Sequence, residues 1–285
     1  MPSLRTADGR RLAWETAGSG PPLLCHPGGP GGSSRCFDGL PGLAAERTLL
    51  LLDPRGTGSS DPPADPEAYA LEDYSADIEA VREHLGLDRL DLLGHSHGGF
   101  VAMAWAGAYP DSVGRLVLAN TAARFTESIR RVRQAIVESY AGEPWFADAL
   151  AAQEDHEAGR YADVAEFNAL VARRVPFFFP RWDDDSRRVA KRLGEVPWNP
   201  DPLTWFNQHV AATMDLRPGL ARVTSPVLVI TGALDPLGEE SAREIADALA
   251  DATVVVVPDA GHFIFGESAN AEAWSQAILD FLAGR

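Results

Sequence analysis

The sequence predicts an α/β fold in which helices cover both faces of a mostly parallel sheet. Short apolar runs alternate with segments of helical periodicity, as is typical of parallel strands joined by helices. Several of the apolar runs end directly in glycine-rich turns. Residues 122–214 differ, because their pattern is helical and contains no convincing strand. These observations predict a sheet domain that carries a helical insertion.

The first 85 residues are predicted to form a hairpin, two buried strands and a helix. Residues 3–17 alternate in polarity around an Asp-Gly pair, which is typical of a β-hairpin. Apolar runs at 22–26 and 48–52 indicate strands, and each ends in a glycine-rich loop. Residues 72–85 repeat apolar side chains at helical spacing, which predicts an amphipathic helix.

The next unit contains a Gly-x-Ser-x-Gly pattern at 94–98. An apolar strand from Leu90 leads into it, and a helix of small residues follows from about Gly99. This strand–turn–helix setting is the one that the pattern requires. Glycines permit the sharp, strained turn, which lifts the Ser96 hydroxyl off the sheet at a helix N-terminus. Taken alone, the pattern is equally compatible with an ordinary glycine-rich turn.

Beyond this turn, strands and helices continue with one long interruption. The interruption, 122–214, predicts a helical cap whose tryptophans and phenylalanines form a small core of their own. Some of them should also face Ser96, because a cap supplies apolar walls to a pocket. The sheet domain then comprises 1–121 and 215–285. Its remaining elements are expected to be strands at 115–119, 226–232 and 253–257 and helices at 239–250 and 270–282.

Composition and charge exclude several classes of partner. The chain has 285 residues, of which 45% are apolar and 23% charged, as in ordinary globular proteins. A net charge of −16 argues against nucleic-acid and anionic-membrane partners, which require basic surfaces. No apolar run approaches the ~20 residues of a membrane span, and no signal segment precedes the first strand. Cys25 and Cys36 do not form a disulfide framework, so a cytoplasmic protein is expected. The partner expected for it is a small-molecule or short peptide-like substrate.

Ser96 would need a base to activate it and an acid to hold that base. Asp235 follows the predicted strand at 226–232, and His262 follows the one at 253–257. The chain order Ser…Asp…His is the order expected for a nucleophile on such a turn. Because the carboxyl ends of parallel strands meet at one edge of a sheet, the three side chains should converge there. We therefore predict a catalytic triad of Ser96, Asp235 and His262.

Other candidates for the base and the acid are weaker. Asn120, which follows the strand at 115–119, carries no charge, and Asp259 is too close to His262 along the chain and is expected in a turn. The residues that flank Ser96 should point away from its hydroxyl. The remaining histidines are expected to be structural, packed or solvated: His26, His84, His95, His97, His156 and His209.

Acyl transfer also requires donors for the developing oxyanion, each worth roughly 10²–10³ in rate. One donor is expected to be the backbone N–H of His97, the residue after the nucleophile. The other should come from the loop after the strand at 22–26, where glycines let the backbone approach a substrate closely. We assign Gly29, with Gly28 as the alternative. A phosphate-binding loop is disfavoured because no Gly-Lys-Ser/Thr follows.

Together these motifs resemble the α/β-hydrolase superfamily and, within it, the prolyl aminopeptidase (proline iminopeptidase) group. The resemblance rests on His-Pro-Gly-Gly-Pro-Gly-Gly at 26–32, Asp-Pro-Arg-Gly-Thr-Gly-Ser-Ser at 53–60, and the three triad residues. It covers the sheet domain, whereas the cap matches only in position and helical character. It implies an α/β-hydrolase fold and a serine hydrolase without cofactor or metal, which removes a small N-terminal aminoacyl group through an acyl-enzyme.

Two departures keep other substrates open. His97 stands where the group usually has an aromatic residue, so that His-Ser-His looks more like general esterases, and Pro27 stands where the group has its histidine. The alternatives are an esterase, lactonase or thioesterase acting on a small apolar acyl substrate, and a non-catalytic small-molecule-binding protein on the same scaffold. An epoxide hydrolase or dehalogenase is disfavoured, because those chemistries use an aspartate at position 96.

An aminopeptidase would pair the substrate ammonium with a carboxylate, because an unpaired buried charge is costly. Asp215 is preferred because it lies where the cap rejoins the sheet domain. The candidate carboxylates are Glu143, Glu195, Asp201, Asp215 and Glu239. The candidate pocket residues are Asp215, Glu239, Trp205, Phe206 and Trp145.

Overall fold

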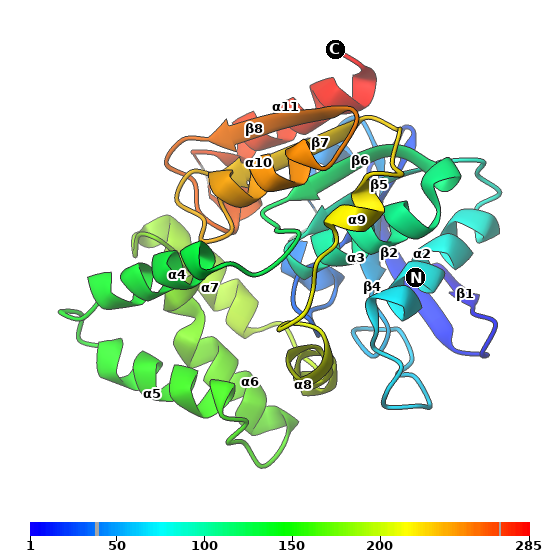
Figure 1. Cartoon of the computed structure of the whole chain (residues 1–285). Helices are drawn as coiled ribbons and strands as arrows, with labels where there is room; N and C mark the ends of the chain where they lie inside the picture. Colours follow the sequence, from blue (N-terminus) through cyan, green and yellow to red (C-terminus); the bar gives the residue numbers. More distant parts are fainter. Residues whose placement is uncertain (38–39, 268) are drawn as a thin grey trace.

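A single eight-stranded sheet forms the centre of the computed structural model, which describes residues 1–37, 40–267 and 269–285 (Figure 1). The strand order is β1-β2-β4-β3-β5-β6-β7-β8. The strands are β1 Ser3–Arg5, β2 Arg11–Ala17, β3 Pro22–His26, β4 Thr48–Asp53, β5 Leu90–His95, β6 Val113–Ala119, β7 Val227–Gly232 and β8 Ala252–Val257.

The first two strands run antiparallel to their neighbours, and β3 to β8 run parallel to one another. Ser3 pairs with Ala13 across the β1–β2 hairpin, and β2 pairs antiparallel with β4. Parallel pairing then extends from β4 through β3, β5, β6 and β7 to β8. The predicted hairpin and the mostly parallel sheet are thus confirmed.

Both faces of the sheet are buried, because alternate strand residues enter two separate cores. In β7, Val227 and Val229 pack in one core, whereas Leu228 and Ile230 pack in the other. The first core is completed by α2 (Leu71–His84), α3 (His97–Ala108), α9 (Arg217–Leu220) and α10 (Glu239–Asp247). The second is completed by α1 (Pro41–Ala44) and α11 (Ala271–Ala283).

The chain between β6 and β7 consists of helices joined by loops and contains no strand, over residues that the structure describes in full. Its helices gather beside the sheet and form small cores of their own (green to olive in Figure 1). Side-chain caps begin four of them, with Thr126, Asp163, Asp183 and Asn199 each accepting from a backbone N–H of the first turn. The helices are α4 Glu127–Ser139, α5 Phe146–Glu157, α6 Val164–Arg174, α7 Asp184–Gly194 and α8 Pro200–His209.

Several details differ from the sequence-based expectations. The helix after Ser96 begins at His97 rather than Gly99, and α10 ends at Asp247, three residues early. The one-turn helices α1 and α9 were not expected, since four residues are too few to show periodicity. Cys25 and Cys36 are buried free thiols. Within the described ranges, no helix is long and apolar enough to cross a membrane.

Candidate active site

Ser96 occupies a strained turn between β5 and α3, with φ 54° and ψ −117°. The flanking glycines are required by close packing. A Cβ on Gly94 would collide with the carbonyl of Gly98, and a Cβ on Gly98 would collide with the carbonyl of His26. The backbone N–H of Ser96 donates to the carbonyl of Ala119 at 3.0 Å, which fixes the turn against β6. Any side chain at 94 or 98 would therefore displace the serine.

His262 joins Ser96 to Asp235 at the carboxyl ends of the parallel strands. Its Nε2 lies 3.1 Å from Ser96 Oγ, and its Nδ1 lies 3.0 Å from each carboxylate oxygen of Asp235. A carboxylate can only accept, so Nδ1 carries the proton and Nε2 is free to accept from the hydroxyl. The loops after β5, β7 and β8 thus bring the three predicted triad residues together.

The Asp235 carboxylate is buried and held by further donors. Asn120 Nδ2 donates to Oδ2 at 2.5 Å, and the N–H of Leu237 donates to Oδ1 at 2.9 Å. Burial by itself raises the pKa of Asp235, but His262 and these donors outweigh it and bring the pKa below its usual value. Asp235 is therefore ionised at neutral pH and can stabilise a positive charge on His262.

The histidines on either side of Ser96 form no hydrogen bond with its hydroxyl. His95 Nε2 lies 2.9 Å from the main-chain oxygen of His262 and donates to it, which helps to fix the backbone of the base. Burial lowers the pKa of His95 to about 3, so its ring is neutral at neutral pH. His97 is buried against Tyr74 and Phe206, and burial lowers its pKa well below the usual value. The support that His95 gives to His262 could not be read from the sequence.

The loop after β3 passes directly beside the serine. A Cβ placed on Gly28 would lie 3.0 Å from Ser96 Cβ, and Gly29 has a φ of +147°. The N–H of His97 belongs to the first turn of α3, where backbone donors have no partner within the helix. The sequence-predicted donor residues thus border the serine from two sides.

The Asp-Pro-Arg-Gly-Thr-Gly-Ser-Ser motif forms hydrogen bonds with the residues that follow this loop. Asp53 Oδ1 accepts from both the N–H (3.0 Å) and the hydroxyl (2.7 Å) of Ser34, and Asp53 Oδ2 accepts from the N–H of Ser59. Arg55 forms a buried ion pair with Asp77 at 2.8 Å. The motif is therefore structural and does not reach the cavity.

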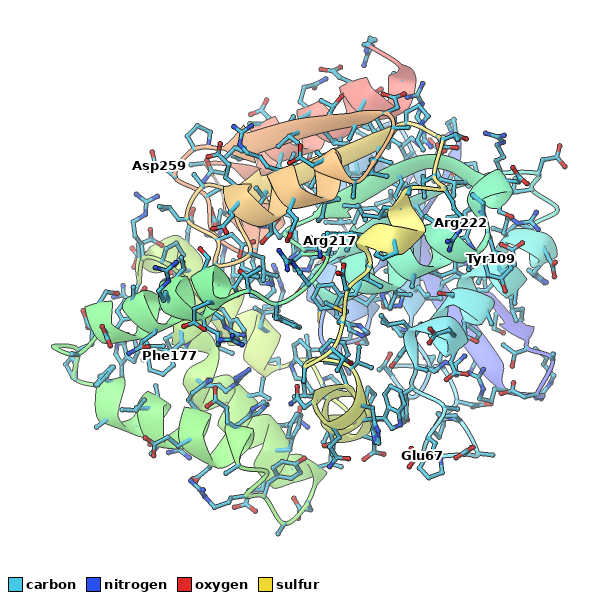
Figure 2. The ribbon with its side chains drawn as sticks, in the orientation of Figure 1. Glu67, Tyr109, Phe177, Arg217, Arg222 and Asp259 are labelled. Carbon is cyan, nitrogen blue, oxygen red and sulfur yellow. The ribbon has the colours of Figure 1, made fainter. Side chains whose placement is uncertain are left out.

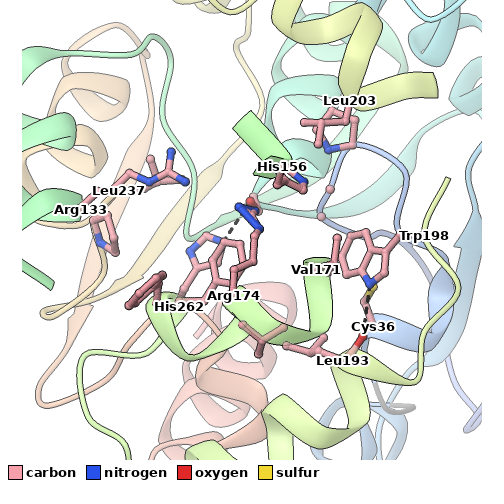
Figure 3. Close-up of a pocket in the computed structure, with 18 of the residues that line it drawn as sticks. Cys36, Arg133, His156, Val171, Arg174, Leu193, Trp198, Leu203, Leu237 and His262 are labelled. Carbon is pink, nitrogen blue, oxygen red and sulfur yellow. Dashed lines mark hydrogen bonds between the residues drawn. The ribbon is translucent and has the colours of Figure 1, made fainter. Parts of the chain in front are cut away.

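A cavity of about 310 Å³ opens above Ser96 between the sheet edge and the helical segment. Its volume lies at the lower end of small-ligand sites. Figure 3 shows residues of several helices around it, together with His262. Its walls are largely aromatic and aliphatic, and include Phe100, Phe125, Phe167, Val171, Leu203 and Phe206.

Polar side chains from α4, α5 and α6 also line the cavity, and none of them was among the predicted site residues. Arg133 comes from α4, Gln153, His156 and Glu157 from α5, and Arg174 from α6. His156 stacks on Phe167, and burial together with Arg174 lowers its pKa to about 3. In the part of the chain that the structure describes, Glu157 and Asp235 are the only carboxylates that line this cavity.

Of the five predicted pocket residues, only Phe206 lines the cavity. Trp205 points away from the cavity, and its Nε1 donates to Glu67 at 3.0 Å, a residue at the outer edge of the molecule in Figure 2. Trp145 packs behind Phe177, one layer away from the cavity. Both expectations are corrected: a large aromatic in a helical segment can equally serve the core of that segment.

The predicted carboxylates lie elsewhere. Asp215 forms a surface ion pair with Arg217, beside α9 rather than among the cap helices (Figure 2). Glu239 forms an exposed ion pair with Arg243 and borders a different groove. Glu143, Glu195 and Asp201 are exposed, and Asp259 lies in an exposed turn. None of these side chains reaches the cavity, so the preference for Asp215 is corrected.

The described residues contain no group of three or more His, Cys, Asp or Glu side chains arranged to hold a metal ion. The contact between His262 Nε2 and Ser96 Oγ is suited to proton transfer from the hydroxyl and nucleophilic attack by Ser96.

Comparison with known proteins extends over nearly the whole chain. The alpha/beta hydrolase fold family matches residues 21–269. A proline iminopeptidase from Clostridium botulinum is 32% identical over 258 residues, which cover 87% of this chain and 86% of that protein. One from Lactobacillus helveticus is 28% identical over 263 residues, with 87% and 85% covered. The structure of an enol-lactonase from Burkholderia xenovorans superimposes with a TM-score of 0.72 at 26% identity, covering 99% and 100% of the two chains.

Proposed function

The chain belongs to the α/β-hydrolase family, and we propose on this basis that it is a serine hydrolase that works through an acyl-enzyme. One observation carries the proposal: His262 lies within hydrogen-bonding distance of both Ser96 Oγ and the Asp235 carboxylate. This is the relation among nucleophile, base and orienting acid that acyl transfer requires.

In the proposed reaction, Ser96 Oγ attacks the substrate carbonyl carbon while His262 Nε2 takes the hydroxyl proton. The N–H groups of His97 and Gly29 stabilise the oxyanion of the tetrahedral intermediate. His262 then returns its proton to the leaving group, and the acyl group remains bound to Ser96. Water attacks the acyl carbon as His262 accepts its proton, and the acid is released as Ser96 regains a proton from His262.

The first proposed substrate class is an amide whose acyl part is a small N-terminal aminoacyl group. It is supported by the relatives, which are proline iminopeptidases at 28–32% identity over most of their length. Glu157 is the carboxylate available in the cavity for a substrate ammonium, in place of those predicted from the sequence. Residues 122–214 act in this proposal as the cap that closes the cavity.

A second substrate class, a small ester or lactone, is favoured by the charge of the cavity. Two arginines and one glutamate line it together with the triad, so a substrate ammonium would meet more positive than negative charge outside the triad. The structural similarity to an enol-lactonase at 26% identity supports the same class.

The decisive experiment compares turnover of proline and alanine anilides with that of p-nitrophenyl esters and simple lactones. Anilide cleavage supports the aminopeptidase. Ester or lactone turnover without anilide cleavage supports the second class. A fluorophosphonate probe should label wild-type protein at Ser96. Absence of both labelling and turnover would leave a non-catalytic binding protein as the correct description.

A further inference from the structure

Two guanidinium groups, those of Arg133 and Arg174, line the cavity from different helices (Figure 3). Within the described ranges, no carboxylate forms an ion pair with either of them. Arg173, the neighbour of Arg174 in the sequence, does form such a pair, with Asp148 at the surface. The two cavity arginines differ from it in having no carboxylate partner.

Arg174 is the more constrained of the two. Its side chain is buried, with 9% of its surface exposed, and its Nε has no hydrogen-bond partner. Nη1 donates to Gln153 at 2.9 Å, and the guanidinium lies 4.9 Å from the centre of the Phe178 ring. Burial and the neighbouring Arg133 lower the pKa of Arg174 to about 10, so the group is charged at neutral pH. A buried charge without an anionic partner is costly, which indicates that the partner is supplied from outside.

Arg133 adds a second charge at the same end of the cavity. It lies on the cavity-facing side of α4, one helical turn from Ile129 and Ile136, and its side chain is exposed to solvent. The surrounding protein lowers its pKa, while Glu157 and Asp235 act in the opposite direction from beyond ion-pair distance. A guanidinium remains protonated under these conditions.

The two nearby carboxylates are engaged with other groups. Glu157 accepts a hydrogen bond from Gln153, one turn earlier on α5. Asp235 is saturated by His262, Asn120 and the N–H of Leu237. Asp235 could serve as the missing counter-ion only by giving up bonds within the triad, and Glu157 lies beyond ion-pair distance of both arginines.

We propose that the cavity takes a substrate bearing a carboxylate, and that Arg133 and Arg174 bind this carboxylate while the scissile carbonyl lies at Ser96. The inference rests on the proposed hydrolase function and deepens it. Guanidinium groups match a carboxylate with paired hydrogen bonds, and the apolar walls suit the short chain that separates it from the carbonyl.

The carboxylate can belong to either half of the substrate, and paired substrates distinguish the two. For the acyl half, p-nitrophenyl hydrogen glutarate is compared with p-nitrophenyl pentanoate, which has the same chain length without the charge. For the leaving group, the dipeptide Pro-Ala is compared with its C-terminal amide. In one of the two pairs, wild-type kcat/KM should favour the charged member by about tenfold or more.

The variants Arg133→Gln and Arg174→Gln should each lower this ratio by about tenfold, the lower end of the range expected for a charge-assisted hydrogen bond. The matched control is Arg131→Gln on α4, which is exposed and does not line the cavity and should keep the wild-type ratio. Because Arg174 is buried, its variant could fail to fold, and Arg133→Gln then decides alone. An active wild-type enzyme without preference in either pair, or an Arg133→Gln variant that keeps the preference, overturns the proposal.

Calorimetric titration separates this inference from the hydrolase proposal. Glutarate should bind wild-type protein more tightly than the neutral glutaramide, and Arg133→Gln should abolish the difference. If the protein is neither labelled by the fluorophosphonate nor active on any substrate tested, but glutarate binds in this way, the hydrolase proposal fails and the carboxylate site stands. If glutarate binds no better than glutaramide, the carboxylate site is refuted whatever the enzyme hydrolyses.

Discussion

The carboxylate of Asp235 accepts hydrogen bonds from His262, from Asn120 and from the N–H of Leu237. The last two bonds fix the plane of the carboxylate, and the position of the His262 ring follows from it. Asn120 also donates to the carbonyl of Gly261 at 3.1 Å, which ties the loop carrying His262 to the same point. A single amide thus positions both the acid and the base.

Replacing Asn120 tests this positioning role. Asn120→Ala removes one hydrogen bond to a charged group, worth about 1.5 kcal/mol or more, so kcat should fall by about tenfold. KM should change little, because Asn120 does not line the cavity. Steady-state kinetics on the best substrate would measure both values. An unchanged kcat would show that Leu237 and His262 hold Asp235 without it.

The nucleophile has a more severe test. Ser96→Ala should lower kcat by a factor on the order of 10⁴ to 10⁶, leaving only what the oxyanion donors and substrate binding supply. Labelling by a fluorophosphonate should disappear, while the thermal unfolding midpoint should remain near the wild-type value. If Ser96→Ala is still labelled and a variant of another serine is not, Ser96 is not the nucleophile.

At the scale of elements, the β5–α3 turn depends on the absence of side chains. Gly98 faces the carbonyls of both His26 and Pro27, so α3 approaches the loop after β3 more closely than any Cβ allows. This approach brings the glycine loop next to Ser96. The geometry of the site therefore depends directly on the close packing of this turn.

Gly98→Ala should consequently destabilise the protein and impair the site together. Backbone atoms would have to move, and we expect the free energy of unfolding to fall by about 3 kcal/mol or more. Gly142→Ala is the matched control, because a Cβ there meets open space, and it should be neutral or stabilising by up to about 1 kcal/mol. Urea denaturation measures both variants. Equal stability of the two would contradict the collision at Gly98.

The helices between β6 and β7 show what the sequence could and could not predict at this scale. Trp205 and Phe206 are adjacent on α8, yet only Phe206 faces the cavity, because neighbouring residues point about 100° apart on a helix. Residue type alone could not decide between them. The orientation of α8 depends on tertiary packing that the local sequence does not contain.

A usable signal for the cavity arginines was nevertheless present. Ile129, Arg133 and Ile136 follow the spacing of one helix face, so Arg133 interrupts an apolar stripe on α4. Arg174 likewise lies on the apolar face of α6, where Phe167 and Val171 precede it by seven and three residues. A charge in an apolar stripe indicates either a buried partner or a ligand, and such positions are better site candidates than exposed carboxylates near a domain junction.

At the scale of the whole molecule, the sheet and the triad were predictable for one shared reason. Strands that are buried on both faces read as apolar runs, and their alternation with helices indicates parallel pairing. The carboxyl ends of these strands then define one edge, where the loops carrying Ser96, Asp235 and His262 meet. The substrate cavity lay beyond this reasoning, because it forms between the sheet edge and helices whose docking is set by long-range contacts such as Asn199 N–H with the carbonyl of Gly31.

Buried neutral histidines should make the stability of the whole molecule sensitive to acid. Burial lowers the pKa of His26 to about 4 and that of His95 to about 3, whereas both titrate near 6.5 in the unfolded chain. Between these limits the unfolded state binds more protons, so the free energy of unfolding falls as the pH drops. From pH 7.5 to 5.0 each histidine should cost about 2 kcal/mol. Urea denaturation at the two pH values measures the total, and in His26→Gln the difference should shrink by about 2 kcal/mol. Equal stability at both pH values, or an undiminished difference in His26→Gln, would mean that the folded protein lets these rings take up protons.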